Sequence, residues 1–263
     1  MVVTMLKHYL EVVMENPSKL KGVFSPRDLK GILNSFTDVD EDSFISYFIG
    51  SDQKQLIDKY RKELLNDVAF FEHLRQTYAD FYQKPLVTIQ PWTNCLYIIV
   101  RILKPKKIVE TGVWAGISTS FILRALERNK MGKLYSIDLP TYDFKTAEEQ
   151  RMKAMPKKAI PGWIIPKYLK KRWKLLIGSS QQHLPKLLRE LKGINMFIHD
   201  SLHTYDHMTF EFQKAWPFVS DDGFLLADNI NWNNAFYDFA EKIKGSRIQK
   251  YNFGAIRKKT LKA

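Results

Sequence analysis

The feature that most constrains the fold is a repeated strand, turn and helix pattern that begins after Pro105. Short runs rich in β-branched and aromatic residues alternate with longer runs of helical period. A strand, a helix and a second strand in succession form a crossover, so this alternation predicts a parallel sheet with helices on both faces. We expect strands at 107–111, 133–138, 173–178, 196–200 and 223–228, and helices at 118–129, 181–191, 205–216 and 233–244.

Two regions lie outside this alternation. The last two expected strands, 247–251 and 254–258, are close enough to form a hairpin, which adds antiparallel strands to the sheet. Residues 1–85 are predicted to be helical: a helix start is indicated at Ser25-Pro26, and 52–82 has no Gly or Pro and apolar residues at helical spacing. That pattern predicts a long amphipathic helix, or one broken once. We therefore divide the chain into an N-terminal helical region, 1–85, and an α/β domain, 86–263.

The net charge of +13 is concentrated in two segments. Residues 151–174 contain nine basic and no acidic residues, residues 241–263 contain eight basic residues and one acid, and the remainder of the chain sums to −3. A basic chain favours nucleic acid, an anionic membrane surface or an acidic small molecule as partner, while each segment alone could also be a solvated face. The protein is therefore not expected to be coated by nucleic acid over its whole surface.

Cysteine content and hydropathy limit the compartment. The single cysteine, Cys95, excludes an internal disulfide and a Cys-rich zinc site, which suits a reducing environment. The longest strongly apolar stretch, 96–103, contains Arg101 and is too short to span a membrane, and the first residues are too charged for a signal peptide. We expect a cytoplasmic protein without a membrane partner.

The first expected strand leads into a glycine-containing turn, Glu110-Thr-Gly112-Val-Trp114-Ala-Gly116-Ile-Ser118. Glycines in such a turn let the backbone approach a ligand, although many strand–helix turns use them for packing alone. The spacing is not the dinucleotide G-x-G-x-x-G pattern, which disfavours a nicotinamide-dependent oxidoreductase. Asp138 closes the second strand, where a carboxylate either accepts hydrogen bonds from a ribose or caps a helix.

A second group of polar residues follows two later strands. Asp200 comes after the fourth expected strand, and Asp228 and Asn229 come after the fifth. Their carboxylate and amide oxygens are hard ligands suited to Mg²⁺ or Ca²⁺, although Asp228 and Asn229 could instead cap the next helix. His203 follows Asp200 by three residues, where it could be simply a histidine at a helix start. Strand alternation turns His199 away from Asp200 and favours a structural role.

These motifs resemble class I S-adenosylmethionine-dependent methyltransferases, specifically the metal-dependent catechol and caffeoyl-CoA O-methyltransferases. The resemblance covers about residues 88–263 and also includes Gly178-Ser-Ser-Gln181 followed by Leu184-Pro185. It implies a Rossmann-like, seven-stranded, mostly parallel sheet with a terminal antiparallel hairpin, and S-adenosylmethionine as cofactor. The residues that it places in the cofactor site are Glu110, Gly112, Trp114, Gly116, Ser118, Asp138, Ser179, Ser180, Gln181 and Asp200.

The resemblance also implies individual roles. Glu110, Gly112 and Ser118 would contact the methionine part of the cofactor, Asp138 the ribose, and Ser180 with Gln181 the adenine. Asp200, Asp228 and Asn229 would hold a divalent cation such as Mg²⁺. The base would stand at His203, where the family often has lysine; histidine there is similar to the macrolide-sugar O-methyltransferases. Asp200 and His203 are thus the expected catalytic residues.

The expected activity is methyl transfer to a hydroxyl of a small molecule, with a sugar, a phenol and an anionic acceptor as candidates. The basic segment between the second and third strands carries Trp163, Tyr168 and Trp173, which could cover the acceptor or pack beneath a solvated lid. Residues 231–234 would reach the acceptor side. RNA methylation and non-catalytic cofactor binding are the alternatives, with nucleic acid not favoured. The long N-terminal helix is a candidate element of a homodimer.

Overall fold

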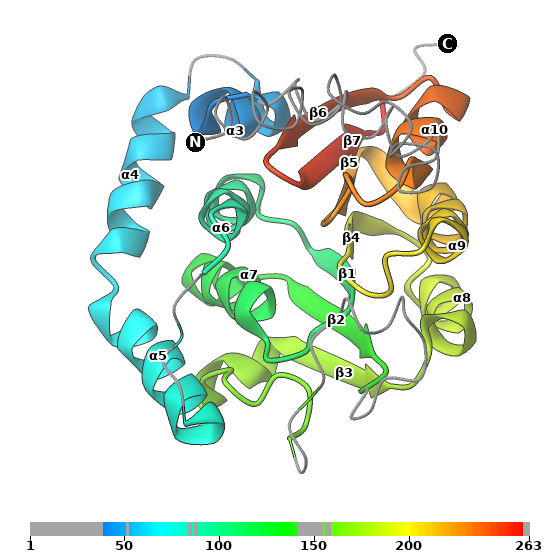
Figure 1. The fold of residues 1–263 in the computed structure, drawn as a ribbon. Coiled ribbons are helices and arrows are strands. Elements are labelled where there is room, and N and C mark those ends of the chain that lie inside the picture. The colour runs from blue at the N-terminus through cyan, green and yellow to red at the C-terminus, as the bar shows by residue number, and fades with distance from the viewer. Residues whose placement is uncertain are drawn as a thin grey trace, which may run out of the picture.

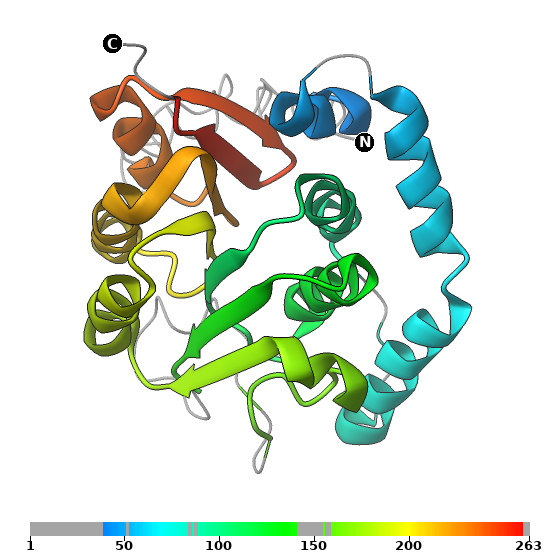
Figure 2. The same cartoon turned by 180° about the vertical axis from the view of Figure 1, so that it is seen from behind.

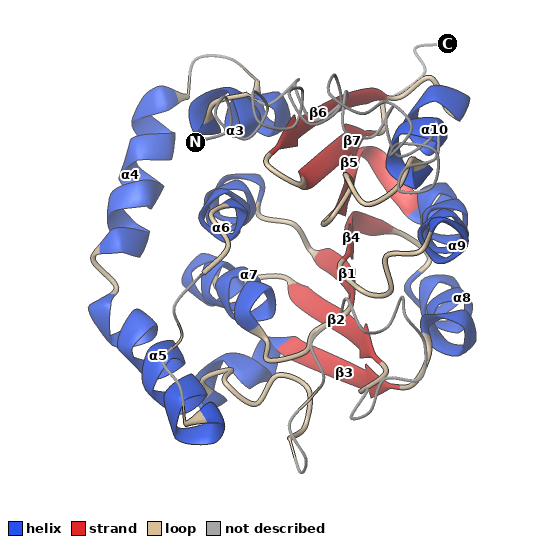
Figure 3. Cartoon of the chain, viewed as in Figure 1, coloured by secondary structure: helices blue, strands red, loops and turns tan. Residues whose placement is uncertain are grey.

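The computed structural model describes residues 39–50, 53–83, 86, 89–140, 155 and 159–259. A seven-stranded sheet of order β3-β2-β1-β4-β5-β7-β6 forms its centre (Figure 3). The strands are β1 (Lys107–Thr111), β2 (Lys133–Asp138), β3 (Trp173–Ile177), β4 (Ile194–His199), β5 (Val219–Ala227), β6 (Ser246–Lys250) and β7 (Phe253–Arg257). The first five are parallel, and β7 pairs antiparallel with both β5 and β6. The predicted Rossmann-like fold class is confirmed.

Helices cover both faces of the sheet. On one face lie α6 (Trp92–Leu103) and α7 (Ile117–Asn129); on the other lie α8 (Ser180–Leu191), α9 (Tyr205–Ala215) and α10 (Ala235–Lys242) (Figures 1 and 2). The strands are short and largely buried, because apolar side chains leave both faces of the sheet and enter two separate cores. This three-layer arrangement brings the carboxyl ends of β1 to β5 to one edge, where the polar motifs lie.

The N-terminal helices add an outer layer on the α6 and α7 face (Figure 1). They are α3 (Glu41–Ile49), α4 (Lys54–Leu65) and α5 (Val68–Tyr82). The expected long helix is broken once, between α4 and α5, where the Asp67 carboxylate accepts a hydrogen bond from Arg124 Nε at 2.6 Å. The helix start indicated at Ser25 lies outside the described residues. The division at residue 85 stays a prediction, since the helices on both sides share one apolar core.

The segment between β2 and β3 is described from residue 159 onward, with residue 155 before it. It contains the 3₁₀ helix η4 (Lys167–Arg172). Trp163 packs in an aromatic group with Tyr82 and Trp114, at ring-centroid distances of 6.0 and 5.5 Å. This segment between β2 and β3, called the insertion below, therefore packs against α5, which lies about 80 residues earlier in the chain. Within the described residues, no helix has the length and hydropathy needed to cross a membrane.

Candidate functional site

A cavity of about 510 Å³ opens at the carboxyl ends of the parallel strands. This is the edge of an open α/β sheet at which ligands generally bind. Its lining includes residues that follow each of β1 to β5, together with Gln90, Trp92 and Thr93 before and within α6. Three of the lining side chains are carboxylates, Asp138, Asp200 and Asp228, and none of the described lining residues is Lys or Arg. The cavity therefore suits a cationic ligand group such as a sulfonium.

The turn between β1 and α7 forms one wall. Gly112 has φ +85°, and a side chain on it would collide with the backbone carbonyl of Asp200, so that only glycine fits between the two strand ends. Trp114 also adopts a left-handed φ, of 46°. Asp138 Oδ2 accepts hydrogen bonds from the backbone N–H groups of Val113 and Trp114, at 2.6 and 2.9 Å, which holds this turn.

Asp138 thus has a structural partner as well as a place in the cavity wall. Burial raises the pKa of its carboxyl, while the two backbone hydrogen bonds oppose that shift. Both of those bonds use Oδ2. The expected hydrogen bond to a ribose would therefore fall to Oδ1, and this role stays a prediction.

Glu110 and Gly116 lie behind the cavity wall rather than in it. The fully buried Glu110 carboxylate accepts hydrogen bonds from Ser118 Oγ at 3.3 Å, Thr119 Oγ1 at 2.9 Å and Ser136 Oγ at 2.8 Å. Burial raises its pKa to about 7 despite these donors. A side chain at Gly116 would meet the Cα of Gly162 at 2.8 Å, so this glycine is needed for packing on the insertion. Gly112, Trp114 and Ser118, by contrast, line the cavity.

The segment after β3 forms the opposite wall. Ser179 caps α8 by accepting a hydrogen bond from the backbone N–H of Gln182, at 3.4 Å. Ser179, Ser180 and Gln181 all line the cavity. Gln181 Nε2 lies 3.0 Å from Nδ1 of His207 on α9, so the expected adenine segment is joined to the next helix by a side-chain contact.

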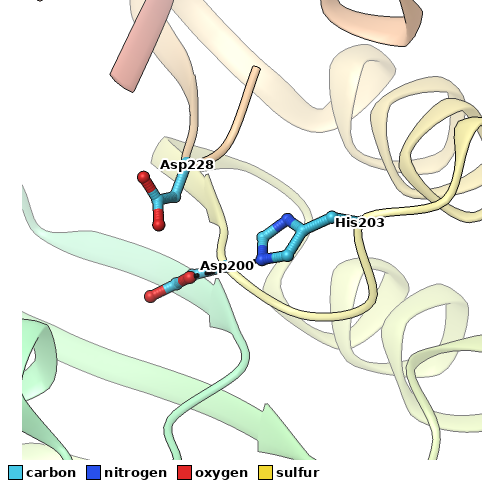
Figure 4. Close-up of side chains that lie close together, drawn as sticks. All are labelled: Asp200, His203 and Asp228. Carbon is cyan, nitrogen blue, oxygen red and sulfur yellow. Dashed lines mark ion pairs between the residues drawn. The ribbon is translucent and has the colours of Figure 1, made fainter. Parts of the chain in front are cut away.

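Asp200, Asp228 and His203 converge at the ends of β4 and β5 (Figure 4). One ligand atom from each lies within 4.8 Å of the other two. His203 Nε2 is 3.8 Å from Asp200 Oδ1, and the His203 side chain is only 6% exposed. Asp228 Oδ1 is buried and has no hydrogen-bond partner among the described residues. The three predicted residues therefore form one group, as the parallel strand ends require.

Electrostatics in this group depend on burial and on like charges. Burial, and next the neighbouring Asp228 carboxylate, raise the pKa of Asp200 well above its usual range. Burial likewise raises the pKa of Asp228 to about 6. Burial, and next the His199 ring, lower the pKa of His203, so that its imidazole is neutral at neutral pH. Two carboxylates that have no Lys or Arg partner in the described part of the chain, one of them with an unpaired oxygen, fit a hard divalent cation.

Asn229, Trp232 and Asn233 follow β5 and make different contacts around the cavity. Asn229 lines the cavity with a left-handed φ of 51°, and its Oδ1 accepts a hydrogen bond from Asn252 Nδ2 at 2.7 Å. This oxygen keeps a second lone pair, so the role of Asn229 as a cation ligand beside Asp200 and Asp228 stays a prediction. Trp232 lines the cavity with its ring centroid 5.1 Å from that of His203, and Asn233 donates to the His203 carbonyl at 2.9 Å.

The aromatic residues of the insertion do not line the cavity in the part of the chain that is described. Trp163 packs against α5, and Trp173 donates its Nε1 to Ser136 Oγ at 2.8 Å within the sheet. Tyr168 is exposed and lies beside Arg124. Of the two interpretations of these residues, packing fits all the described contacts. The basic residues at 151, 153, 157 and 158 lie outside the described part.

Sequence reasoning missed Glu211, which lies beneath the cavity on α9. Its carboxylate is fully buried and 2.6 Å from His199 Nδ1, so the structural role expected for His199 is confirmed. Its hydrogen-bonded imidazole partners lower the pKa of Glu211 far enough to outweigh burial. The available signal was the i, i+4 spacing of His207 and Glu211, which puts an imidazole and a carboxylate on one face of α9.

Comparison with known proteins gives one family match and a shared fold. Residues 109–230 match the family model described as a methyltransferase domain. A search of curated protein sequences gave no match. Among solved structures, the chain is similar to TomG, an O-methyltransferase from Streptomyces achromogenes in complex with S-adenosylmethionine, at 18% identity and a TM-score of 0.53, over 80% of this chain and 99% of TomG.

Two further solved structures are similar over nearly their whole length. One is an O-methyltransferase from Bacillus cereus in complex with S-adenosylhomocysteine, at 17% identity and a TM-score of 0.52, over 77% of this chain and 97% of the other. The second is an S-adenosylhomocysteine-bound methyltransferase from Podospora anserina, at 15% identity and a TM-score of 0.52, covering 80% and 97%. Residues 109–230 therefore resemble a methyltransferase domain, and the fold is the one seen in solved S-adenosylmethionine-dependent methyltransferases. The assignment of residues 86–263 as one domain stays a prediction.

Proposed function

We propose that this chain transfers the methyl group of S-adenosylmethionine to a hydroxyl of a small molecule, and that a divalent cation such as Mg²⁺ takes part. The observation that carries the proposal is the group formed by Asp200, Asp228 and His203. This group lies in the wall of a cavity that is also lined by the turn between β1 and α7 and by residues 178–181 after β3. A cation site, a candidate base and a candidate cofactor site therefore share one cavity.

Each wall of the cavity would hold a different part of the cofactor. The turn at Gly112 and the side chain of Ser118 would face the methionine part, Asp138 Oδ1 the ribose, and Ser180 with Gln181 the adenine. Glu110 would act through Ser118, to which it is hydrogen bonded, because its carboxylate lies behind the wall. S-adenosylmethionine supplies an electrophilic methyl group on a positively charged sulfur, and the lining carboxylates favour that charge.

The acceptor hydroxyl would lie between the cofactor and the pair of aspartates. Asp200 and Asp228 would hold the cation, which lowers the pKa of a hydroxyl bound to it. His203 Nε2 points toward Asp200 and would take the hydroxyl proton, since its low pKa leaves the imidazole neutral and able to accept. Trp232 and Asn233 keep the His203 ring and backbone in place. Positioning of this kind supplies much of the rate of a bimolecular transfer.

The acceptor class follows from the chemistry of the lining. Trp92, Trp232, Leu139 and Met155 offer apolar and aromatic surface around the polar groups. That surface suits a phenolic ring or the apolar face of a sugar. An anionic acceptor, the third candidate, would need a cationic group from outside the described lining, which contains no Lys or Arg.

The direct test incubates the protein with S-adenosylmethionine, Mg²⁺ and a panel of phenols, catechols and hydroxylated sugars. Mass spectrometry then detects a methylated product together with S-adenosylhomocysteine. We expect at least one panel member to be methylated, with loss of product after chelation. Methylation of RNA alone would favour the RNA alternative. Cofactor binding without any transfer would favour the non-catalytic one.

A cytoplasmic location and a homodimer complete the proposal. The location rests on the single Cys95, which is buried and free within the fold.

The homodimer rests on the N-terminal helices, whose outer surface carries exposed Leu65 and Val68 at the break between α4 and α5. Size-exclusion chromatography with light scattering tests the dimer.

A further inference from the structure

Glu211 is enclosed by hydrogen-bond donors on every side. Its Oε2 accepts from Thr111 Oγ1 at 2.6 Å and is 2.6 Å from His199 Nδ1. Its Oε1 accepts from Ser201 Oγ at 3.0 Å and is 2.9 Å from His207 Nε2. A carboxylate has about four lone-pair positions, so these four contacts satisfy it completely. The group is therefore held as a charged acceptor beneath the cavity floor.

The charge of Glu211 fixes the tautomer of His207. A carboxylate only accepts hydrogen bonds, so His207 Nε2 must carry the proton that faces it. The hydroxyl oxygens of Ser180 and Ser201, each 3.2 Å from the same nitrogen, can also accept a hydrogen bond from this N–H group. In a neutral imidazole the other nitrogen is then an acceptor. His207 Nδ1 therefore presents a lone pair to Gln181.

The lone pair of His207 in turn fixes the side-chain amide of Gln181. Gln181 Nε2 lies 3.0 Å from Nδ1, and only the NH₂ group of an amide can donate to it. The carbonyl oxygen, Oε1, must then point away from His207. Gln181 lines the cavity, and its side chain is exposed, so this oxygen is free to meet a ligand there.

We infer that Glu211, acting through His207, orients the amide of Gln181 with its oxygen toward the cavity, so that the site selects a 6-aminopurine over a 6-oxopurine cofactor. The inference rests on the proposed function, in which this wall holds the adenine. The amino group of adenine donates a hydrogen bond to Oε1, whereas the 6-oxo group of hypoxanthine places a second acceptor against it. Glu211 and His207 are positioning residues, because they act only through Gln181.

The test compares two ligands that differ at this position, S-adenosylhomocysteine and S-inosylhomocysteine, by isothermal titration calorimetry. The wild-type protein should prefer S-adenosylhomocysteine by at least about tenfold, the size expected when one hydrogen bond is replaced by two opposed acceptors. The ratio of the two dissociation constants is the readout. A general loss of structure weakens both ligands and leaves that ratio unchanged.

His207→Gln separates orientation from packing. The side-chain NH₂ of the new residue can still donate to Glu211, but the position of Nδ1 is left without an acceptor. The preference for S-adenosylhomocysteine over S-inosylhomocysteine should fall by about fivefold or more, while the melting temperature changes little. Gln181→Ala should lower the preference to the same level, and the double variant should lower it no further, because both residues act through one contact. Gln182→Ala, an exposed neighbour on α8, is the matched control and should keep the wild-type ratio.

Each outcome is informative. A preference that falls in His207→Gln and Gln181→Ala but not in Gln182→Ala supports the inference. An equal affinity of the wild-type protein for the two ligands overturns it, as does a preference that survives in His207→Gln. Failure of the wild-type protein to bind either ligand overturns the proposed cofactor site itself and is recognised by the absence of heat in both titrations.

Discussion

Two groups of acids lie beneath and within the cavity, and their surroundings shift their pKa values in opposite directions. Glu211 is surrounded by four donors, and its pKa is lowered although it is fully buried. Among the described residues, Asp200 and Asp228 form no ion pair with Lys or Arg, Asp228 Oδ1 has no hydrogen-bond partner, and the pKa values of both carboxyls are raised. Desolvation acts to raise the pKa of the acids in both groups, so their hydrogen-bond and charged partners decide the direction of the shift.

This difference in hydrogen-bond partners distinguishes an acid that stabilises the fold from acids that are available to bind a ligand. A satisfied carboxylate contributes to folding and has no capacity left for a new partner. An unsatisfied pair costs stability and persists where a ligand supplies the missing charge. On this comparison Glu211 should matter for stability, and Asp228 with its neighbour His203 should matter for binding and catalysis. The predictions below test that separation.

The largest effect is expected for His203→Gln. It removes the proposed base, so the rate of methyl transfer to an acceptor from the panel should fall by roughly 10²–10⁴-fold. The free energy of unfolding should change little, because His203 Nδ1 has no hydrogen-bond partner to lose. Steady-state kinetics and urea unfolding measure the two quantities. His73→Gln, on the exposed surface of α5, is the control, and a variant at 203 with the wild-type rate would remove the base assignment.

Glu211→Gln should have the next largest effect, and on stability. The substitution leaves an amide NH₂ facing buried donors and removes the charge that pairs with two imidazoles, at a cost of about 3–5 kcal/mol. Urea unfolding followed by circular dichroism measures it, with Glu190→Gln on the exposed face of α8 as control. A loss below about 1 kcal/mol would show that the four contacts do not act as a unit.

Asp228→Asn should show the reverse pattern in protein without metal. Removing one of two facing carboxylates relieves their repulsion, so the free energy of unfolding at pH 7 should stay the same or rise by about 1 kcal/mol. Methyl transfer should nevertheless be lost. Asp221→Asn, exposed on β5, the strand that ends just before Asp228, is the matched control and should change neither quantity. A strongly destabilised Asp228→Asn protein would place this residue with the structural acids.

The pH dependence of stability gives the smallest effect. The folded protein binds a proton at Asp228 up to about pH 6, whereas an unfolded aspartate has a pKa near 3.8. Between these values the folded state holds more protons, so this group lowers the stability of the metal-free protein as pH rises through that window. Added Mg²⁺ should raise the melting temperature by several degrees at pH 7.5 and much less at pH 5. Differential scanning fluorimetry measures the shift, and an equal shift at both pH values would contradict it.

The fold was largely predictable because its signals are local. The bounds of β1 and β2 match the expected ranges, since short apolar runs between turns are typical of buried parallel strands. The convergence of Asp200 and Asp228 followed from the rule that parallel strand ends share an edge. β5 begins earlier than expected, at Val219, because the exposed Asp221 and Asp222 resemble a loop in the sequence.

The remaining features depend on contacts between distant segments. Trp163 looked like a candidate acceptor residue among cations, but its partners on α5 lie some 80 positions earlier, and periodicity carries no information on that pairing. Glu211 looked like an ordinary exposed acid of a helix. Its burial depends on donors from β1, on the loop after β4 and on α9 itself, which only the assembled fold brings together.

The most direct test of the contrast between the two acid groups is cation binding by the wild-type protein and Asp228→Asn. Mn²⁺, a paramagnetic substitute for Mg²⁺, is titrated in the presence of S-adenosylhomocysteine and followed by electron paramagnetic resonance. We expect one bound ion in the wild-type protein, competition by Mg²⁺, and affinity at least about tenfold weaker in Asp228→Asn but unchanged in Asp221→Asn. Wild-type protein that binds no ion, or an Asp228→Asn variant that binds it equally well, would contradict the account.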